Sequence, residues 1–163
     1  MKRTLLTLLT ALCLCISMAS CSGKDVAPEE VMTLPEDQSE KGISKKLGAT
    51  PSSKEKNKES GISANNYENS EFAGHNGQIS FYYDKDGSVL YYKWFITEQD
   101  EKKAKEIYSD VCQALSGSYG DGVENNSEAS GLYTASYTND KQQITAQLQG
   151  NDSGWEISYM VVG

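Results

Sequence analysis

The stretch Gln78–Ile96, with the sequence QISFYYDKDGSVLYYKWFI, decides the fold. Its two outer parts, QISFYY and SVLYYKWFI, are rich in β-branched and aromatic residues and therefore predict two strands. Between them, Asp84-Lys85-Asp86-Gly87 is typical of a type I turn whose glycine takes the left-handed position of a bulge. A calcium loop can begin with the same string, but its later liganding positions and closing glutamate are missing. We therefore expect a β-hairpin and no metal site.

Both faces of this hairpin are apolar and aromatic when its strands are paired across a three-residue loop. One face carries Ile79, Phe81, Tyr83, Val89, Tyr91 and Phe95, and the other carries Tyr82, Leu90, Tyr92, Trp94 and Ile96. A single helix can cover only one face, so we expect an aromatic surface that faces outward as an interaction site. Its candidate binding residues are Tyr82, Tyr92 and Trp94. The alternative is that the sheet curls and covers both faces, with tyrosine serving only as a good strand former.

A helix is predicted directly after the hairpin. Thr97 is the expected N-cap, with Asp100 as its capping-box partner, and Gly117 is the expected C-cap. One apolar stripe at helical spacing comprises Ala104, Ile107, Tyr108, Val111, Cys112 and Leu115. Because Cys112 lies within this stripe, we expect a buried, inert thiol there and no nucleophile.

The rest of the C-terminal part predicts a polar loop and three more strands. The loop is Ser118–Ser130, and the strands cover about residues 132–138, 142–149 and 155–162. Apolar and polar residues alternate in each strand, which is typical of half-buried antiparallel strands. The predicted fold is therefore a single small α+β domain at residues 72–163. Its order is β-β-α-β-β-β, with one amphipathic helix packed on an antiparallel sheet.

The residues before this domain have a different composition. Residues 21–71 hold all three prolines of the chain and a charged low-complexity run at 52–60. Their apolar residues are isolated, without a sustained period of 2 or 3.6. Such a segment buries too little apolar surface to offset its ordering entropy. We therefore expect residues 21–71 to be a disordered tether.

The first 20 residues have the order of a secretory signal peptide that is cleaved off. Lys2 and Arg3 precede an uncharged, leucine-rich run, and small residues follow it. The ending Ser17-Met18-Ala19-Ser20-Cys21 resembles the lipobox of bacterial lipoproteins, although Met18 stands where leucine is commonest. This resemblance covers only residues 1–21. It implies cleavage before Cys21, a diacylglycerol on its thiol, and an extracytoplasmic domain anchored to the cell membrane by its acyl chains.

Two other outcomes are open for this segment. The first is ordinary secretion, with cleavage after Ala19, and the second is an uncleaved signal anchor. All three outcomes place the C-terminal part outside the cytoplasm, because the positive N-terminal region stays inside. In the lipoprotein, Cys13 and Cys15 are discarded and Cys21 is capped. Only Cys112 then remains as a thiol, so no intrachain disulfide can form.

The charge of the processed chain excludes one class of partner. Removing Lys2 and Arg3 from the 15 basic residues leaves 13 lysines against 23 acidic residues, a net charge of about −10. No arginine follows position 3. Nucleic-acid binding relies on basic patches and on bidentate guanidinium contacts. We therefore expect no nucleic-acid partner.

The search for catalytic chemistry is negative. His75 is the one histidine of the chain, and its neighbours in the sequence provide no dyad partner. The sequence contains no zinc-ligand spacing, no phosphate loop and no nucleophile elbow. The carboxylates of Glu98, Asp100 and Glu101 stand at a helix N-terminus, where the helix dipole already accounts for them. We therefore expect no enzyme, no cofactor and no metal.

These observations favour a lipid-anchored, extracytoplasmic binding module with an envelope protein, a peptide or a glycan as its partner. The aromatic sheet face or the Ser118–Ser130 loop would carry the binding. The alternative is a structural or accessory envelope lipoprotein without a ligand of its own. A more remote alternative is a hydrolase that uses surface carboxylates. An outward aromatic patch would favour the binding module, and a pocket that gathers His75 with carboxylates would favour the hydrolase.

Overall fold

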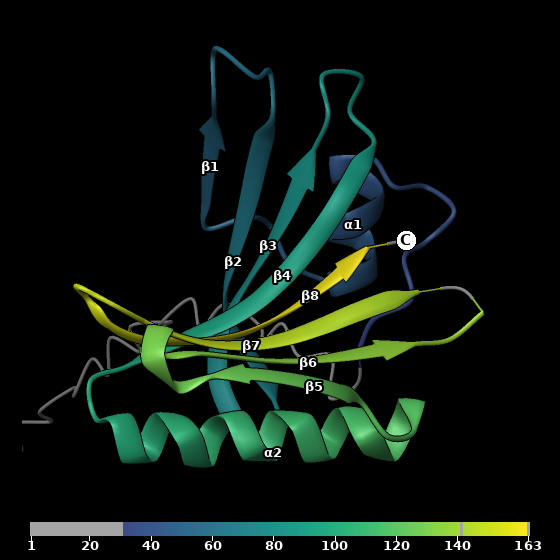
Figure 1. Ribbon diagram of the computed structural model, residues 1–163. Coiled ribbons are helices and arrows are strands. Elements are labelled where there is room, and N and C mark those ends of the chain that lie inside the picture. The colour runs from purple at the N-terminus through teal and green to yellow at the C-terminus, as the bar shows by residue number, and fades with distance from the viewer. Residues whose placement is uncertain (1–30, 141, 163) are drawn as a thin grey trace, which may run out of the picture.

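The computed structural model describes residues 31–140 and 142–162. Within these residues, eight strands form one antiparallel sheet in the order β1-β2-β3-β4-β8-β7-β6-β5 (Figure 1). The strands are β1 (Ser53–Lys56), β2 (Ser63–Phe72), β3 (His75–Tyr83), β4 (Val89–Glu98), β5 (Val123–Ser127), β6 (Leu132–Thr138), β7 (Gln143–Asn151) and β8 (Gly154–Val162). The helices are α1 (Glu40–Leu47), α2 (Glu101–Tyr119) and the short 3-10 helix η1 (Glu128–Ser130). The predicted class, a single α+β domain with a helix packed on an antiparallel sheet, is confirmed.

Both α-helices of the described chain lie on the same face of this sheet, called the inner face below. The long helix α2 packs on β4, β6, β7 and β8. The short helix α1 reaches β2, where Ser44 Oγ lies 3.1 Å from the hydroxyl of Tyr67. Figure 1 shows a strong twist, with β2–β4 rising steeply and β5–β7 running nearly horizontally. This twist lets the two helices cover different halves of one face.

The hydrophobic core lies between the inner face and the helices. The helix α2 contributes four buried side chains, Ala104, Ile107, Val111 and Leu115. The largest fully buried side chains of the described residues are aromatic, namely Trp94, Tyr67, Tyr92, Tyr159 and Phe81. Neighbouring rings pack edge-to-face and stacked, arrangements that aromatic quadrupoles favour.

The predicted hairpin and its turn are confirmed. Asp84 Oδ1 accepts hydrogen bonds from the backbone N–H groups of Asp86 and Ser88, each at 2.9 Å. Gly87 has a φ of 85°, the left-handed conformation that a glycine adopts without strain. The aspartate side chain thus closes the turn, which accounts for the Asp-x-Asp-Gly string.

The predicted register of the hairpin is confirmed at the first pair, Tyr83 with Val89, and is wrong by one residue beyond it. Tyr82 pairs with Tyr91, whereas Tyr83 pairs with Val89, so Leu90 is the extra residue of a bulge. Side chains alternate between faces, and a slip of one residue therefore moves each side chain of one strand to the other face. As a result Tyr92, predicted to share a face with Tyr82, lies on the opposite, inner face.

The helix α2 is confirmed, but its predicted ends are wrong. Its N-cap is Asp100, whose side chain accepts a hydrogen bond from the backbone N–H of Lys103 at 2.9 Å. Thr97 is still in β4, paired with Glu156. The helix continues through Gly117 to its C-cap at Gly120. An aspartate side chain satisfies the free N–H groups of the first turn better than a threonine three residues away from them.

The prediction of a disordered tether is wrong for residues 31–71. This part of the chain contains α1, β1 and β2, and β2 joins the sheet through its pairing with β3. The predicted domain boundary at residue 72 falls on the last residue of β2. Residues 21–30 and the predicted signal peptide lie outside the described residues.

The sequence of β2, SANNYENSEF, hides this strand because it lacks alternation. Asn66 is buried, and its side-chain oxygen accepts a hydrogen bond from Ser80 Oγ at 2.7 Å. A bulge between Tyr67 and Ser70 then shifts the register. Buried polar side chains are stable when they are hydrogen-bonded in this way. The isolated apolar residues of residues 31–71 are part of the same core as those of the later strands. Ile43 of α1, for example, has 0% exposure.

The predicted loop Ser118–Ser130 is also different in the structure. Val123–Ser127 forms the edge strand β5, which pairs with β6, and η1 follows it. All five side chains of β5 are exposed. The strand therefore rests on backbone pairing, which leaves no hydrophobic pattern in the sequence. The three strands predicted after this loop are confirmed as β6, β7 and β8.

Candidate functional site

Two of the three predicted binding residues lie in the core. Tyr92 and Trp94 each have 0% exposure. The Tyr92 hydroxyl donates a hydrogen bond to the Met32 carbonyl oxygen at 2.7 Å, and Trp94 Nε1 donates one to the Ser70 carbonyl oxygen at 2.9 Å. The prediction that Tyr92 and Trp94 face a partner is therefore wrong. Tyr92 holds the segment before α1 against the sheet, and Trp94 ties β4 to β2 within the sheet.

The third predicted residue, Tyr82, lies on the opposite face of the sheet, called the outer face below. Its ring stacks on that of Tyr91, with centroids 4.4 Å apart and an interplanar angle of 18°. Both side chains are half-exposed. Partial burial raises the pKa of Tyr82, so its hydroxyl stays protonated as a hydrogen-bond donor. The bulge at Leu90 brings the two rings together, because it places Tyr91 directly opposite Tyr82.

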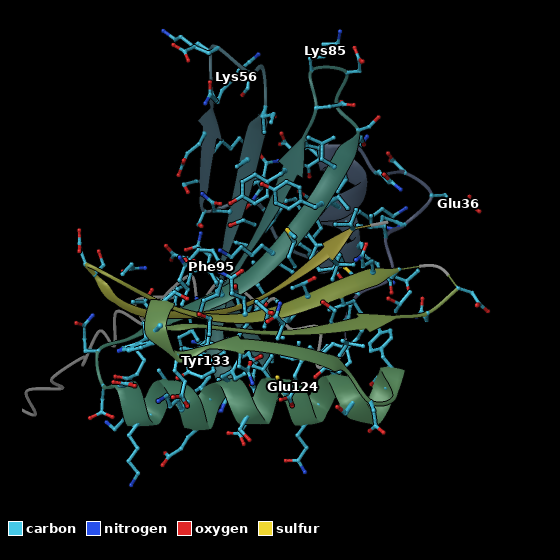
Figure 2. The ribbon with its side chains drawn as sticks, in the orientation of Figure 1. Glu36, Lys56, Lys85, Phe95, Glu124 and Tyr133 are labelled. Atoms are coloured by element: carbon cyan, nitrogen blue, oxygen red, sulfur yellow. The ribbon has the colours of Figure 1, made fainter. Side chains whose placement is uncertain are left out.

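A third aromatic ring lies further along β4 on the same face. The Lys93 ammonium is 5.4 Å from the ring centroid of Phe95, within the range of a cation–π contact. The same ammonium forms an ion pair with Glu156 of β8. Met160 is directly opposite Lys93 in the β4–β8 pairing and is 36% exposed. Figure 2 labels Phe95, which belongs to β4.

We call this group the outer patch. It consists of Tyr82, Tyr91, Lys93, Phe95, Glu156 and Met160. The register of β3, β4 and β8 places these six side chains on one face, opposite the described helices. Within residues 31–140 and 142–162, neither α-helix packs on this face. The outer patch combines apolar rings with one paired positive and negative charge.

The sequence prediction missed Tyr91 and Phe95 because its register placed both on the face opposite Tyr82. The connection itself was predicted correctly, because Tyr83 pairs with Val89 in both cases. The difference is the bulge at Leu90, which changes the residues of β4 that share a face with Tyr82 and which no residue type in the sequence marks. Hydrophobicity alone does not favour one register of β4 over the other, since both faces of the hairpin are aromatic.

His75 has an acidic partner that the sequence did not reveal. It is the first residue of β3, and its Nε2 lies 2.9 Å from Asp110 Oδ2 on α2. A shallow depression of about 410 Å³ beside this pair is lined by Ala73, Asp110, Gln113 and Ala114. The arrangement links the β2–β3 turn to α2. In the described part of the chain, no serine, threonine or cysteine side chain lies within hydrogen-bond distance of His75, so the pair lacks a nucleophile.

Cys112 is half-buried on α2, beside Tyr137. Burial raises the pKa of the Cys112 thiol, with a smaller contribution from the negative charge of Glu124. A raised pKa keeps the thiol protonated, and a protonated thiol is a poor nucleophile. Cys112 is thus less buried than predicted, and its lack of reactivity stays a prediction.

Cys21, the predicted lipidation residue, lies outside the described residues. Among the residues that the structure does describe, no group of three histidine, cysteine, aspartate or glutamate side chains is placed to hold a metal ion. None of the helices in that same part of the chain has the length and hydropathy needed to cross a membrane.

A scan against protein-family models and searches of curated proteins and of solved structures found no match for this chain. A functional assignment therefore rests on the geometry of the outer patch.

Proposed function

We propose that the protein is a lipid-anchored, extracytoplasmic binding module whose outer patch contacts an envelope protein or peptide. The observation that carries this proposal is the stacked pair Tyr82–Tyr91 on a sheet face that the described helices leave uncovered. Tyrosine is favoured at protein interfaces because each ring offers apolar area together with a hydroxyl. The lipid anchor at Cys21 rests on the lipobox-type sequence.

The geometry of the rings favours a protein or peptide over a glycan. A sugar ring stacks on a free aromatic face, but Tyr82 and Tyr91 each turn one face to the other. The ammonium of Lys93 lies over the ring of Phe95. Each tyrosine thus offers a partner at most one ring face, together with its edge and hydroxyl, and Met160 adds a partly exposed apolar side chain. This mixture matches the apolar core and polar rim of a protein interface.

Site-specific photo-crosslinking tests the binding surface. Tyr91 is replaced by p-benzoyl-phenylalanine in the full chain, and cross-linked products are identified in intact cells. We expect a discrete cross-linked envelope protein that is lost when Tyr82→Ser removes the neighbouring ring. The matched control places the same photo-crosslinker at Gln113, which is exposed on α2 on the other side of the sheet. Equal products from positions 91 and 113, or none from position 91, would contradict the proposal.

The lipid anchor has its own test. Cys21→Ala should release the protein from the membrane fraction and abolish incorporation of a labelled fatty acid, because the thiol that carries the diacylglycerol is gone. Cys112→Ala is the matched control, since it removes the half-buried thiol of the folded domain and leaves Cys21 in place. Continued membrane retention and labelling of the Cys21→Ala variant would contradict the anchor.

A further inference from the structure

The two edge strands of the sheet differ in how they are protected from pairing with another chain. An edge strand presents unpaired backbone groups, and natural proteins guard such edges with lysine or proline, among other devices. The edge strand β1 has the sequence SKEK, with Pro51 just before it. The edge strand β5 has the sequence VENNS, without a lysine or a proline, and Val123 is 75% exposed. Among the described strands, β5 is therefore the less protected edge, whereas the lysines of β1 oppose pairing with another basic edge and not with an acidic one.

The lysines of β1 lie on one face of that strand. The pairing of β1 with β2 places Lys54 and Lys56 on the inner side of the sheet, and Glu55 on the outer side. Lys54 forms an ion pair with Glu40, and Glu55 Oε1 accepts a hydrogen bond from Asn66 Nδ2. Lys56 has no ion-pair partner among the residues that the structure describes. It is an exposed cation at the free edge of the sheet.

The opposite edge has the complementary charge. The pairing of β5 with β6 places Glu124 on the inner side of the sheet, opposite Ala135. Between Lys105 and Lys141 the chain contains six acidic residues and no lysine or arginine. Among the described residues, no lysine or histidine forms an ion pair with Glu124. Its carboxylate accepts a hydrogen bond from Asn126 Nδ2 at 3.3 Å. Figure 2 shows Lys56 near the top of the molecule and Glu124 far below it, next to α2.

We propose that the occupant of the β5 edge is the β1 edge of a second copy of this chain, in an antiparallel pair with Lys56 opposite Glu124. The same register places Lys54 opposite Asn126, Glu55 opposite Asn125 and Ser53 opposite Ser127. No like charges are opposed, and the four residues of β1 fit within the five of β5. The inner faces of the two copies coincide in this register. The surface lies at the sheet edges and is separate from the outer patch.

The contact joins two different edges, so it is heterologous and leaves a free β1 and a free β5 at the ends of each pair. Such contacts add copies head to tail, until the chain of copies closes into a ring or continues as a filament. The strong twist of the sheet sets the rotation from one copy to the next. The backbone hydrogen bonds supply most of the contact, and the exposed ion pair selects the register.

Disulfide trapping in intact cells tests the register. Full-length Lys56→Cys and Glu124→Cys variants are expressed together, because directly opposed side chains in an antiparallel pair are close enough for a disulfide. Under mild oxidation we expect a peptide linked between positions 56 and 124, identified by mass spectrometry. The control pair is Lys85→Cys with Glu124→Cys, where Lys85 is an exposed lysine in the β3–β4 turn. A 56–124 linkage that is absent, or no more abundant than the 85–124 linkage, overturns the proposal.

A charge exchange separates this contact from other associations of the protein. Glu124→Lys should weaken the association of copies about two- to five-fold, as expected for an exposed ion pair, measured by sedimentation of the full chain in detergent. The double variant Lys56→Glu with Glu124→Lys should restore it. Association unaffected by Glu124→Lys, or not restored by the double variant, would show that the copies meet elsewhere. Since the outer patch is intact in these variants, photo-crosslinking from Tyr91 should be unchanged.

Discussion

Trp94 is held at the centre of the core by contacts on three sides. Its ring stacks on Tyr159 at a centroid distance of 5.8 Å and an interplanar angle of 11°, and it also packs against Phe72. Its indole N–H donates to the carbonyl oxygen of Ser70, next to the bulge of β2. One side chain therefore ties β2 to β4 and β8. In contrast, Tyr82 makes its main aromatic contact with a half-exposed neighbour.

The first prediction concerns this difference between a core ring and a surface ring. Trp94→Ala should reduce the free energy of unfolding by about 3–5 kcal/mol, because it opens a cavity and leaves the Ser70 carbonyl oxygen without its donor. Tyr82→Ala should cost only about 1 kcal/mol, since the ring is half-exposed and loses one stacked pair. Urea unfolding of the two variants measures both values. Similar losses for the two variants would contradict the assignment of the inner and outer faces.

At the scale of elements, two glycines show how the same residue serves different purposes. Gly117 is within α2, and a Cβ added there would meet no atom within 4 Å. Gly77 is within β3, where a Cβ would lie 2.6 Å from the Phe95 carbonyl oxygen and 2.7 Å from Trp94 Cε2. The backbone of β3 therefore approaches the core tryptophan at a distance that only glycine permits. The glycine of α2 has no such role.

The second prediction follows from these two positions. Gly117→Ala should stabilise the protein by about 0.5–1 kcal/mol, because alanine loses less conformational entropy than glycine when a helix forms. Gly77→Ala should destabilise it by about 1–3 kcal/mol through the forced displacement of Trp94 or of β4. Thermal unfolding followed by circular dichroism compares the pair. Destabilisation by Gly117→Ala would indicate that the helix ends near residue 117, as the sequence alone predicted.

At the scale of the whole molecule, the fold depends on a set of tyrosines that are buried in the neutral form. Burial raises the pKa of Tyr92 and Tyr159 well above the usual range, and it raises the pKa of Tyr137 to about 12. The same cause raises the pKa of Tyr67, which is 1% exposed. In the unfolded chain these groups ionise near the ordinary tyrosine value of about 10. Ionisation is therefore linked to unfolding.

The third prediction is a loss of stability at alkaline pH. A group whose pKa is higher in the folded state contributes stability that is fully present below its unfolded pKa and is lost as the pH rises. The free energy of unfolding should thus be constant up to about pH 9 and fall from about pH 10 through pH 12. Urea unfolding at several pH values measures this fall, and tyrosinate absorbance should rise together with unfolding. A stability that is unchanged between pH 8 and pH 12 would contradict the burial of these hydroxyls.

Much of the fold could be predicted because the relevant signals are local. The turn at Asp84–Gly87, the apolar stripe of α2 and the alternating strands after residue 131 each lie within one short segment. The strands β1, β2 and β5 could not be predicted, because most of their side chains are polar and show no alternation with apolar ones, and the pairing partners of β1 and β2 were not recognisable from either segment alone. The buried side chain of Asn66, for instance, is hydrogen-bonded to Ser80 of β3 and to Ser53 and Glu55 of β1, which are all distant in the sequence.

The candidate site also depended on a strand register that could not be predicted from the sequence. Tyr82 was predicted to face a partner, and the structure leaves it half-exposed on an uncovered face. Tyr92 and Trp94 were predicted beside it and are buried instead. The bulge at Leu90 makes this difference. One extra residue in the hairpin exchanges the two faces of β4, and both faces are aromatic, so the residue types do not oppose the exchange.

The sequence by itself determined the class of the fold, the position of the hairpin turn and the helix that covers the sheet, because each follows from local periodicity and turn chemistry. It also provided the lipobox-type signal on which the proposed anchor at Cys21 rests. Only the tertiary structure decided which aromatic residues are buried, that residues 31–71 belong to the sheet, and that the sheet has an acidic edge at β5. These features depend on pairings between distant segments, whose register is set by the packing of the whole core.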